Sequence, residues 1–143
     1  MIRAQLSDEI RKILSTARTI AVVGISPKPE RPSHQVAKYL LAAGYRVLPV
    51  NPGQREILGL PCYPDLPSVP ERIDIVDIFR RPDQVEPIVR GAVACGAQLI
   101  WMQEGIVNER AAAYAEENGI AVVMDRCLMV DHRNLFGSGG SSL

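Results

Sequence analysis

The chain has 143 residues, the length of one ordinary domain, and 47% of them are hydrophobic, which is enough for a buried core. Its 16 Lys and Arg residues balance 16 Asp and Glu residues. This balance argues against a disordered chain and against a nucleic-acid-binding surface, which needs clustered Lys and Arg. We therefore expect a single globular domain over residues 1–143, with no nucleic-acid partner.

The apolar runs and the cysteines indicate a cytoplasmic protein. No apolar run approaches the roughly 20 residues that cross a bilayer, and residues 1–9 carry acids early without an apolar signal core. Cys62, Cys95 and Cys127 are odd in number, widely spaced and outside any metal-binding pattern. We expect reduced thiols, no metal and no membrane association.

The first 50 residues predict a helix, a strand, a second helix and a second strand. Residues 7–14 are amphipathic, with acids at the positive end of the expected helix. Residues 19–24 are a short apolar run of the kind that forms a strand buried on both faces. Ser33 is placed to cap a helix that stops at Gly44, and residues 45–50 form the second strand.

The middle of the chain predicts an irregular connection and a third strand. Residues 51–72 contain five prolines and leave room for one short helical turn. Residues 73–79 form the third strand. We expect its Asp74 and Asp77 at the start and the rim of the sheet, because central strands seldom bury acids.

The last third predicts two more pairs of helix and strand. Pro87 fits the first turn of a helix over residues 85–95, and residues 99–102 form the fourth strand. A helix over residues 108–118, capped by the asparagine at its start, precedes a fifth strand over residues 120–124.

Strands and helices alternate along the whole chain, so right-handed crossovers give a parallel sheet covered on both faces. The expected fold class is α/β, a Rossmann-like doubly wound parallel sheet of five strands in a three-layer αβα arrangement. We favour the strand order 3-2-1-4-5, with the flavodoxin-like order 2-1-3-4-5 as the alternative. Residues 137–143, rich in Gly and Ser, should form a disordered tail.

The candidate site follows from this fold. In open α/β sheets the ligand lies beyond the carboxyl ends of the strands, where the strand order reverses. The loop segments expected to converge there are residues 24–33, 51–53, 79–81, 103–105 and 125–127.

The segment after the first strand has the composition of a phosphate-binding loop. Gly24 permits a tight turn and a close backbone approach. Ser33 opens a helix whose free N–H groups attract anions, and two cations stand beside it. A simpler interpretation is that Gly24 and Ser33 only form a turn and a cap. The residues assigned to this phosphate site are Gly24, Ser26, Pro27, Lys28, Arg31 and Ser33.

The end of the second strand distinguishes nucleotide ligands. An NAD site places an acid there, roughly 20 residues after its glycines, to hold the ribose hydroxyls. This chain has Asn51 and Pro52 at that place, and its next acid is Glu56. The missing carboxylate disfavours NAD and suits a ribose that carries a phosphate, as in NADP or coenzyme A.

The turns after the third and fourth strands add four candidates. Phe79 and Arg80 follow the third strand, and Arg80 could contact a phosphate or be a solvated cation. Gln103 and Glu104 follow the fourth strand and could hold a turn or touch the ligand.

No group of residues has the makeup of a catalytic centre. His34 stands in a first helical turn and is interpreted as a solvent or packing residue, and His132 has no nucleophile beside it. None of the cysteines is paired in sequence with a base. Asp125 and Arg126 most simply form a local ion pair. We expect a binding protein that is not an enzyme.

Several segments, taken together and in order, carry a family resemblance. They are residues 22–26 (VVGIS), 31–36 (RPSHQV), 50–52 (VNP), 101–106 (WMQEGI) and 125–129 (DRCLM). With them the chain resembles, over residues 10–136, the small stand-alone CoA-binding domain proteins. These are relatives of the N-terminal domain of the succinyl-CoA synthetase alpha subunit.

The resemblance implies that CoA or an acyl-CoA lies across the carboxyl edge of the sheet, without ligase activity. The synthetase's phosphohistidine belongs to a second domain, which this sequence does not contain. Where the synthetase carries a lysine after the second strand, this chain has Gln54 and Arg55, and Lys28 or Arg31 could substitute. The residues that map onto the family's binding turns are Gly24, Ser26, Asn51, Pro52, Phe79, Arg80, Gln103 and Glu104.

Two other functions stay open from the sequence. One is an NAD(P)-binding regulatory domain, which shares the fold and differs at the ribose contact. The other is an accessory subunit of an acyl-CoA ligase or transferase, in which a separate chain supplies the catalysis. The expected partner is a small-molecule ligand, and association with further copies of the chain stays open as well.

Overall fold

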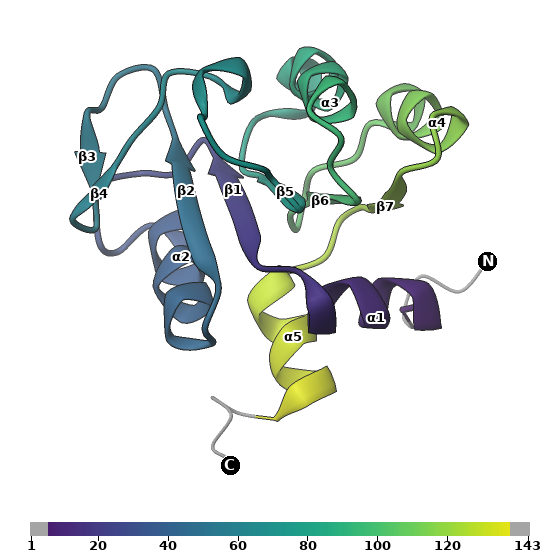
Figure 1. Ribbon diagram of the computed structural model, residues 1–143, viewed down its shortest axis with the longest axis horizontal. Coiled ribbons are helices and arrows are strands. Elements are labelled where there is room, and N and C mark those ends of the chain that lie inside the picture. Colours follow the sequence, from purple (N-terminus) through teal and green to yellow (C-terminus); the bar gives the residue numbers. More distant parts are fainter. Residues whose placement is uncertain (1–5, 138–143) are drawn as a thin grey trace.

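The computed structural model describes residues 6–137, and within them the chain forms a sheet with helices on both faces (Figure 1). The tail predicted to be disordered lies almost wholly outside the described residues. The strands of the sheet are β1 (Thr19–Val23), β2 (Arg46–Val50), β5 (Ile75–Ile78), β6 (Leu99–Met102) and β7 (Ala121–Val123). The helices are α1 (Asp8–Thr16), α2 (Pro32–Ala42), α3 (Val85–Ala94), α4 (Glu109–Glu117) and α5 (Leu128–Phe136).

The sheet confirms the predicted fold class but not the favoured strand order. All its strands are parallel, and they follow one another as β2-β1-β5-β6-β7, which is the alternative order 2-1-3-4-5. The favoured order 3-2-1-4-5 is wrong. It would require a strand on the outer edge of β2, and the chain itself occupies that edge. The N–H of Tyr63 donates to the carbonyl of Pro49, and the N–H of Asn51 donates to the carbonyl of Tyr63.

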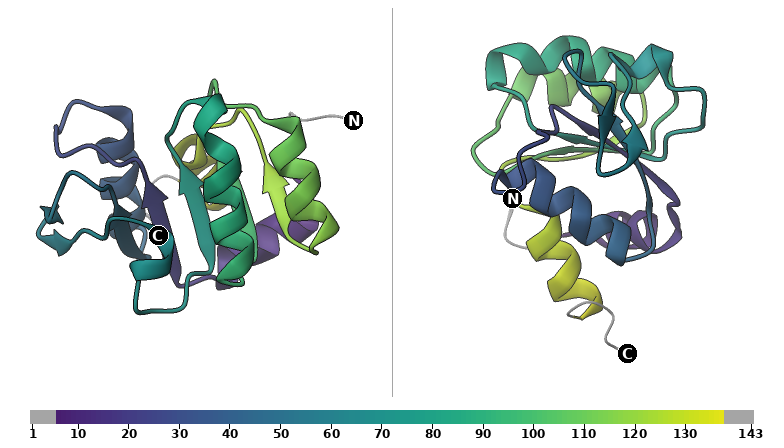
Figure 2. Two further views of the ribbon diagram at one scale, coloured as in Figure 1. Left: turned by 90° about the horizontal axis from the view of Figure 1, so that it is seen from above. Right: turned by 90° about the vertical axis from the view of Figure 1, so that its left-hand side faces the viewer.

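Two helical layers cover the sheet, and each has its own apolar core (Figures 1 and 2). Helices α3 and α4 cover one face, over side chains such as Val76 and Ile100. Helices α1, α2 and α5 cover the other face, where Trp101 and Leu128 are completely buried. Because the strands are parallel, all of them end at the same edge of the sheet, and the loops that follow the strands emerge there.

The proline-rich connection after β2 contains more structure than the sequence suggested. The predicted helical turn is a short 3₁₀ helix at Leu66–Ser68. A small hairpin, β3 (Glu56–Ile57) with β4 (Leu60–Pro61), precedes it. Strands of two residues are too short to leave an alternating pattern, so the sequence did not predict the hairpin. A second 3₁₀ turn, Pro82–Gln84, leads into α3.

The two acids of β5 differ from each other. Asp74 lies at the start of the strand, as predicted. Asp77 was expected at the rim and is instead completely buried in the middle of the sheet, level with Val22 on β1 and Trp101 on β6. The prediction for Asp77 was wrong because β5 is the central strand of the sheet, and β1 and β6 flank Asp77 on both sides.

Two further local predictions were wrong. Arg31, and not Ser33, occupies the cap position of α2, because Pro32 takes the first helical position and has no N–H to be capped. Helix α5 was not predicted, because its cap residue Cys127 makes no side-chain hydrogen bond and gives no start signal. No helix within residues 6–137 is long and apolar enough to cross a membrane.

Candidate ligand-binding site

The reversal of strand order lies between β1 and β5, which are neighbours in the sheet. The chain leaves β1 toward α2 on one face and leaves β5 toward α3 on the other face (Figure 1). The two exits diverge and leave a crevice at the carboxyl edge of the sheet, the usual ligand position in this class of fold. Two grooves open there, one on each face.

The first, the proline groove, lies on the face covered by α3 and has a volume of about 330 Å³. Four prolines and several aliphatic side chains form most of its wall, so a flat apolar ring would fit between them. Its wall includes Val23, Val50, Pro52, Pro64, Leu66, Pro67, Pro87 and Ile88. Of these, the sequence analysis had named only Pro52 as a contact.

The second, the helix groove, lies on the opposite face, between the starts of α2 and α5, and has a volume of about 470 Å³. Predicted residues Phe79, Gln103 and Glu104 line it. Cys127, which was expected in a converging segment but not as a contact, and Met129 line it as well. Met129 was missed together with helix α5.

Arg80 lines both grooves, and Gly24 faces it across the crevice. Gly24 has a φ of +88°, a conformation that L side chains rarely adopt. A Cβ atom at this position would lie 2.4 Å from the carbonyl oxygen of Phe79 and 2.8 Å from the Cδ of Arg80. The glycine therefore lets β1 and the Arg80 side chain approach closely, and Arg80 is the residue that the two grooves share.

The loop after β1 is held by hydrogen bonds to Ser26. The Ser26 N–H donates to the Ser33 Oγ at 2.9 Å, and the Nδ1 of His34 donates to the Ser26 carbonyl, also at 2.9 Å. The Ser26 Oγ accepts from the Lys28 N–H at 3.1 Å. Ser33 and His34 are both buried, so their structural role is to orient the loop. His34 is a packing residue, as the sequence suggested, and it also fixes the loop.

The start of α2 offers fewer free donors than expected. The N–H groups of His34 and Gln35 both donate to the Arg31 carbonyl. Pro32 has no N–H, so the Ser33 amide is the donor that the first turn leaves for an anion. The exposed side chains of Lys28 and Arg31 lie on the same loop but line neither groove.

Asn51 connects the two loops that follow β1 and β2. Its Nδ2 donates to the Ile25 carbonyl at 2.8 Å, and its Oδ1 accepts from the Gly53 N–H at 2.8 Å. Both ends of the amide are occupied within the protein. Asn51 therefore shapes the site, while its neighbour Pro52 supplies the wall of the proline groove.

Part of the hydrogen-bonding capacity of the polar side chains in the helix groove is used within the protein. Gln103 is 4% exposed, and its Oε1 accepts from the Leu128 N–H at 3.2 Å, so the amide nitrogen is the part available to a ligand. Glu104 is exposed at the rim.

The predicted ion pair between Asp125 and Arg126 was wrong. The Arg126 guanidinium pairs with Asp131 at 2.5 Å, and Asp125 accepts from the Gly105 N–H.

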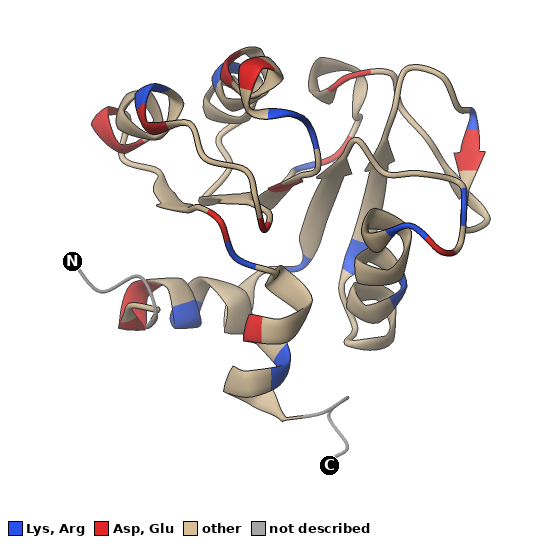
Figure 3. Ribbon diagram, turned by 180° about the vertical axis from the view of Figure 1, so that it is seen from behind, with Lys and Arg blue, Asp and Glu red and all other residues tan. Residues whose placement is uncertain are grey.

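Cations border the crevice (Figure 3). Within residues 6–137, the side chains of Lys28, Arg31 and Arg80 take part in no ion pair, and Arg80 is half-buried. Arg81 pairs with Asp83 at 3.6 Å. The same part of the chain holds no cluster of His, Cys, Asp or Glu that could bind a metal ion.

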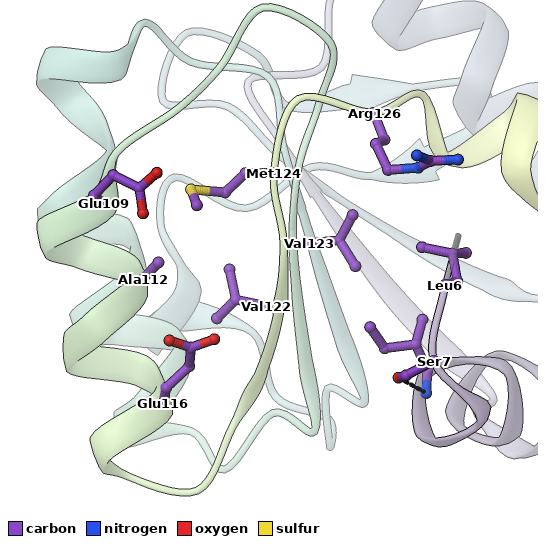
Figure 4. A pocket seen from close by; sticks show the side chains of 10 residues that line it. Leu6, Ser7, Glu109, Ala112, Glu116, Val122, Val123, Met124 and Arg126 are labelled. Carbon is purple, nitrogen blue, oxygen red and sulfur yellow. Dashed lines mark hydrogen bonds between the residues drawn. The ribbon is translucent and has the colours of Figure 1, made fainter. Parts of the chain in front are cut away.

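A cavity at the far edge of the sheet is chemically different (Figure 4). It lies between α1 and α4 beside β7 and has a volume of about 260 Å³. Among residues 6–137, its charged lining residues are Glu109 and Glu116 on α4 and Arg126, which pairs with Asp131. This lining offers a phosphate more acids than cations, so it suits a nucleotide less well than the crevice does.

The fold defines a doubly wound α/β protein with a crevice at its switch point. Residues 18–133 match the family model described as CoA binding domain, and the chain belongs to this family. It is 41% identical to YneT, an uncharacterized protein of Bacillus subtilis, over 87% of this chain and 92% of that protein.

The chain is also similar to a solved structure and to an enzyme. A hypothetical protein from Pyrococcus horikoshii superposes with a TM-score of 0.90 at 42% identity, over 95% of this chain and 96% of that one. The ADP-forming acetate–CoA ligase I of Archaeoglobus fulgidus is 31% identical over 78% of this chain. The match spans only 18% of that ligase. The chain is thus similar to one part of a larger enzyme.

Proposed function

We propose that the chain binds coenzyme A across the carboxyl edge of its sheet and does not transform it. The observation that carries the proposal is the pair of grooves at the carboxyl edge that share Arg80, which Gly24 lets lie close to β1. CoA has an aromatic base at one end, a long arm at the other and phosphates between them. A member of the CoA binding domain family with two grooves joined at an unpaired cation matches this layout.

The adenine would lie in the proline groove, where Pro52 and Ile88 offer flat apolar contacts. The phosphates would lie near Arg80, with Lys28 and Arg31 reaching them from the loop, because charge-assisted hydrogen bonds hold phosphate best. The pantetheine arm would run through the helix groove toward Gln103 and Glu104. Phe79 lines the helix groove only, so it would contact the arm and not the base.

Thermal unfolding with a panel of ligands tests this assignment. Ligand at 100 times its Kd stabilises the folded state by about 2.7 kcal/mol. We expect that stabilisation with CoA, a smaller one with dephospho-CoA, and little with NAD or ATP. A clear shift with NADP and none with CoA would replace the proposal by the NAD(P)-binding alternative.

The absence of catalysis is the second half of the proposal. The histidine beside the crevice, His34, is buried and engaged with the Ser26 carbonyl. The other histidine, His132, bonds to Tyr39 at 2.7 Å and lines neither groove, and burial lowers its pKa. Incubation with acetyl-CoA and a thiol reagent should therefore show no release of free CoA above the uncatalysed rate. Release above that rate, abolished by a groove variant, would contradict this half.

The partial match to ligases favours a second candidate function. Because the chain corresponds to about a fifth of such an enzyme, it could present CoA to a separately encoded ligase. Purification of the tagged protein from its native cells tests this. Recovery of a ligase chain in fixed ratio would support it, and recovery of the protein alone would leave CoA binding as the whole function.

A further inference from the structure

The floor of the helix groove is apolar, and its charges stand at the rim. Val36 is 2% exposed and belongs to the buried core beneath the groove. Phe79, Cys127 and Met129 are half-buried and pack on that core. The charged side chain of Glu104 lies outside them and is exposed. A ligand group that reached the floor would contact mainly carbon and sulfur.

The thiol arm alone does not require such a floor. Two amide groups of the arm match polar partners higher in the groove, such as the free amide nitrogen of Gln103. Beyond them a bare thiol would leave the half-buried Phe79 and Met129 largely uncovered. Apolar surface gains free energy when it is removed from water, so the floor favours a ligand that carries apolar carbon past the sulfur.

We propose that the preferred ligand is an acyl-CoA whose short, uncharged aliphatic chain covers this floor. The inference rests on the proposed function, since it places the CoA arm in the helix groove. It identifies the acyl group by chemistry: four to six carbons without a terminal charge, because a carboxylate on Phe79 and Met129 would lose its hydration without gaining a partner.

Calorimetric titration with a thioester series tests the preference. A fully buried methylene strengthens binding by about fourfold. We expect butyryl-CoA to bind at least tenfold more tightly than CoA, and acetyl-CoA to lie between them. Succinyl-CoA, of the same length but charged at its end, should bind no more tightly than CoA.

A pair of variants on α5 ties the gain to the floor. Met129→Trp fills the floor of the groove, so it should remove the advantage of butyryl-CoA over CoA, whatever it costs the binding of both ligands. Val130→Trp alters the next residue, which is 42% exposed and lines neither groove, and should keep that advantage. If Met129→Trp does not fold, Met129→Ala should shift the optimum to a longer chain.

The outcomes separate this inference from the proposed function. Equal affinity for CoA and butyryl-CoA in the unaltered protein would overturn the acyl preference and leave CoA binding intact. A preference for butyryl-CoA that survives in Met129→Trp would overturn the placement of the chain on this floor. Failure to bind CoA and every thioester would overturn the proposed function itself.

Discussion

The two ends of the sheet treat their charged groups differently. At the amino end, Asp74 accepts hydrogen bonds from the backbone N–H groups of Arg18 at 2.8 Å and Thr19 at 3.2 Å. Arg46 and Glu71 pair nearby through two contacts of 2.5 and 2.6 Å. At the carboxyl end, Arg80 is half-buried and has no ion pair within residues 6–137. The charges named at the first end bind partners within the protein, whereas Arg80 at the second end is the cation that we propose meets a ligand.

The same contrast separates two kinds of loop. The loops at the amino end are short and closed by side chains of the sheet, such as Thr19, whose Oγ1 donates to the Arg72 carbonyl. The loops at the carboxyl end are longer and brace one another through Ser33, His34 and Asn51. The internal bonding of these loops keeps their shape without using Arg80. A preformed crevice binds its ligand with little ordering cost.

The largest expected effect comes from closing the crevice. Gly24→Ala adds a Cβ atom within 2.8 Å of Arg80 and Phe79 at a φ of +88°. We expect at least a hundredfold loss of CoA affinity, measured by calorimetry, with lower thermal stability. Gly119→Ala is the matched control, since its φ is +80° and no atom lies within 4 Å of the added carbon. Equal CoA affinity in both variants would mean that the ligand does not cross Gly24.

Removing the charge of Arg80 should have the next largest effect on CoA affinity. A hydrogen bond to a charged group contributes about 1.5–3 kcal/mol, so Arg80→Ala should weaken CoA binding by roughly 10- to 100-fold. Arg46→Ala at the amino end should leave CoA affinity unchanged and cost at most about 1 kcal/mol of stability, as exposed ion pairs do. The comparison of the two ends fails if Arg46→Ala weakens binding as much as Arg80→Ala.

Asp74 tests whether the amino end holds the fold. Burial alone would raise the pKa of Asp74, but hydrogen bonds from the Arg18 and Thr19 N–H groups and the charge of Arg72 bring the pKa below its ordinary value. The ionised carboxylate therefore adds stability above its unfolded pKa of about 3.9, and this stability is lost as the pH falls through the lower folded pKa. We expect Asp74→Asn to cost about 1–2 kcal/mol at pH 7 and less at pH 3, by urea unfolding. A constant cost across this range would contradict the role of the charge.

Asp77 gives an effect of the opposite sign. Complete burial raises its pKa well above the ordinary value, and neither carboxyl oxygen has a hydrogen-bond partner among the described residues. The native state keeps the proton that the unfolded chain loses above about pH 4, so stability falls as the pH rises, by up to about 1.4 kcal/mol per pH unit. Asp77→Asn removes this loss and should be more stable than the unaltered protein at pH 7 but not at pH 3. Lower stability of the variant at both pH values would show that Asp77 has a partner.

The sequence was sufficient for the fold class and for the edge of the sheet at which the crevice opens. Apolar runs such as residues 19–23 and glycines after the helices are local signals, and they predicted strands and helices that the structure confirms. The strand order is not determined by local signals in the sequence. It depends on Tyr63 returning to pair along β2, and no pattern in the proline-rich segment announces that pairing.

The candidate site residues also divide into those that local signals could predict and those that depend on tertiary packing. Gly24, Pro52 and Arg80 lie directly after strands, so their convergence followed from the parallel sheet. The walls of the grooves came from elsewhere, with Ile88 on α3 and Met129 on α5. Side chains on helices reach a crevice only through tertiary packing, and an undetected helix hides them altogether. The contact roles assigned to Ser26, Lys28, Arg31 and Ser33 stay predictions until a ligand is seen.

A crystal structure of the protein grown with CoA tests the central claim most directly. We expect the base between Pro52 and Ile88, the phosphates within hydrogen-bonding distance of the Arg80 guanidinium, and the arm passing over Gly24 into the groove beside Gln103. CoA bound elsewhere, such as in the cavity between α1 and α4, would contradict the account, and so would phosphates that leave Arg80 untouched.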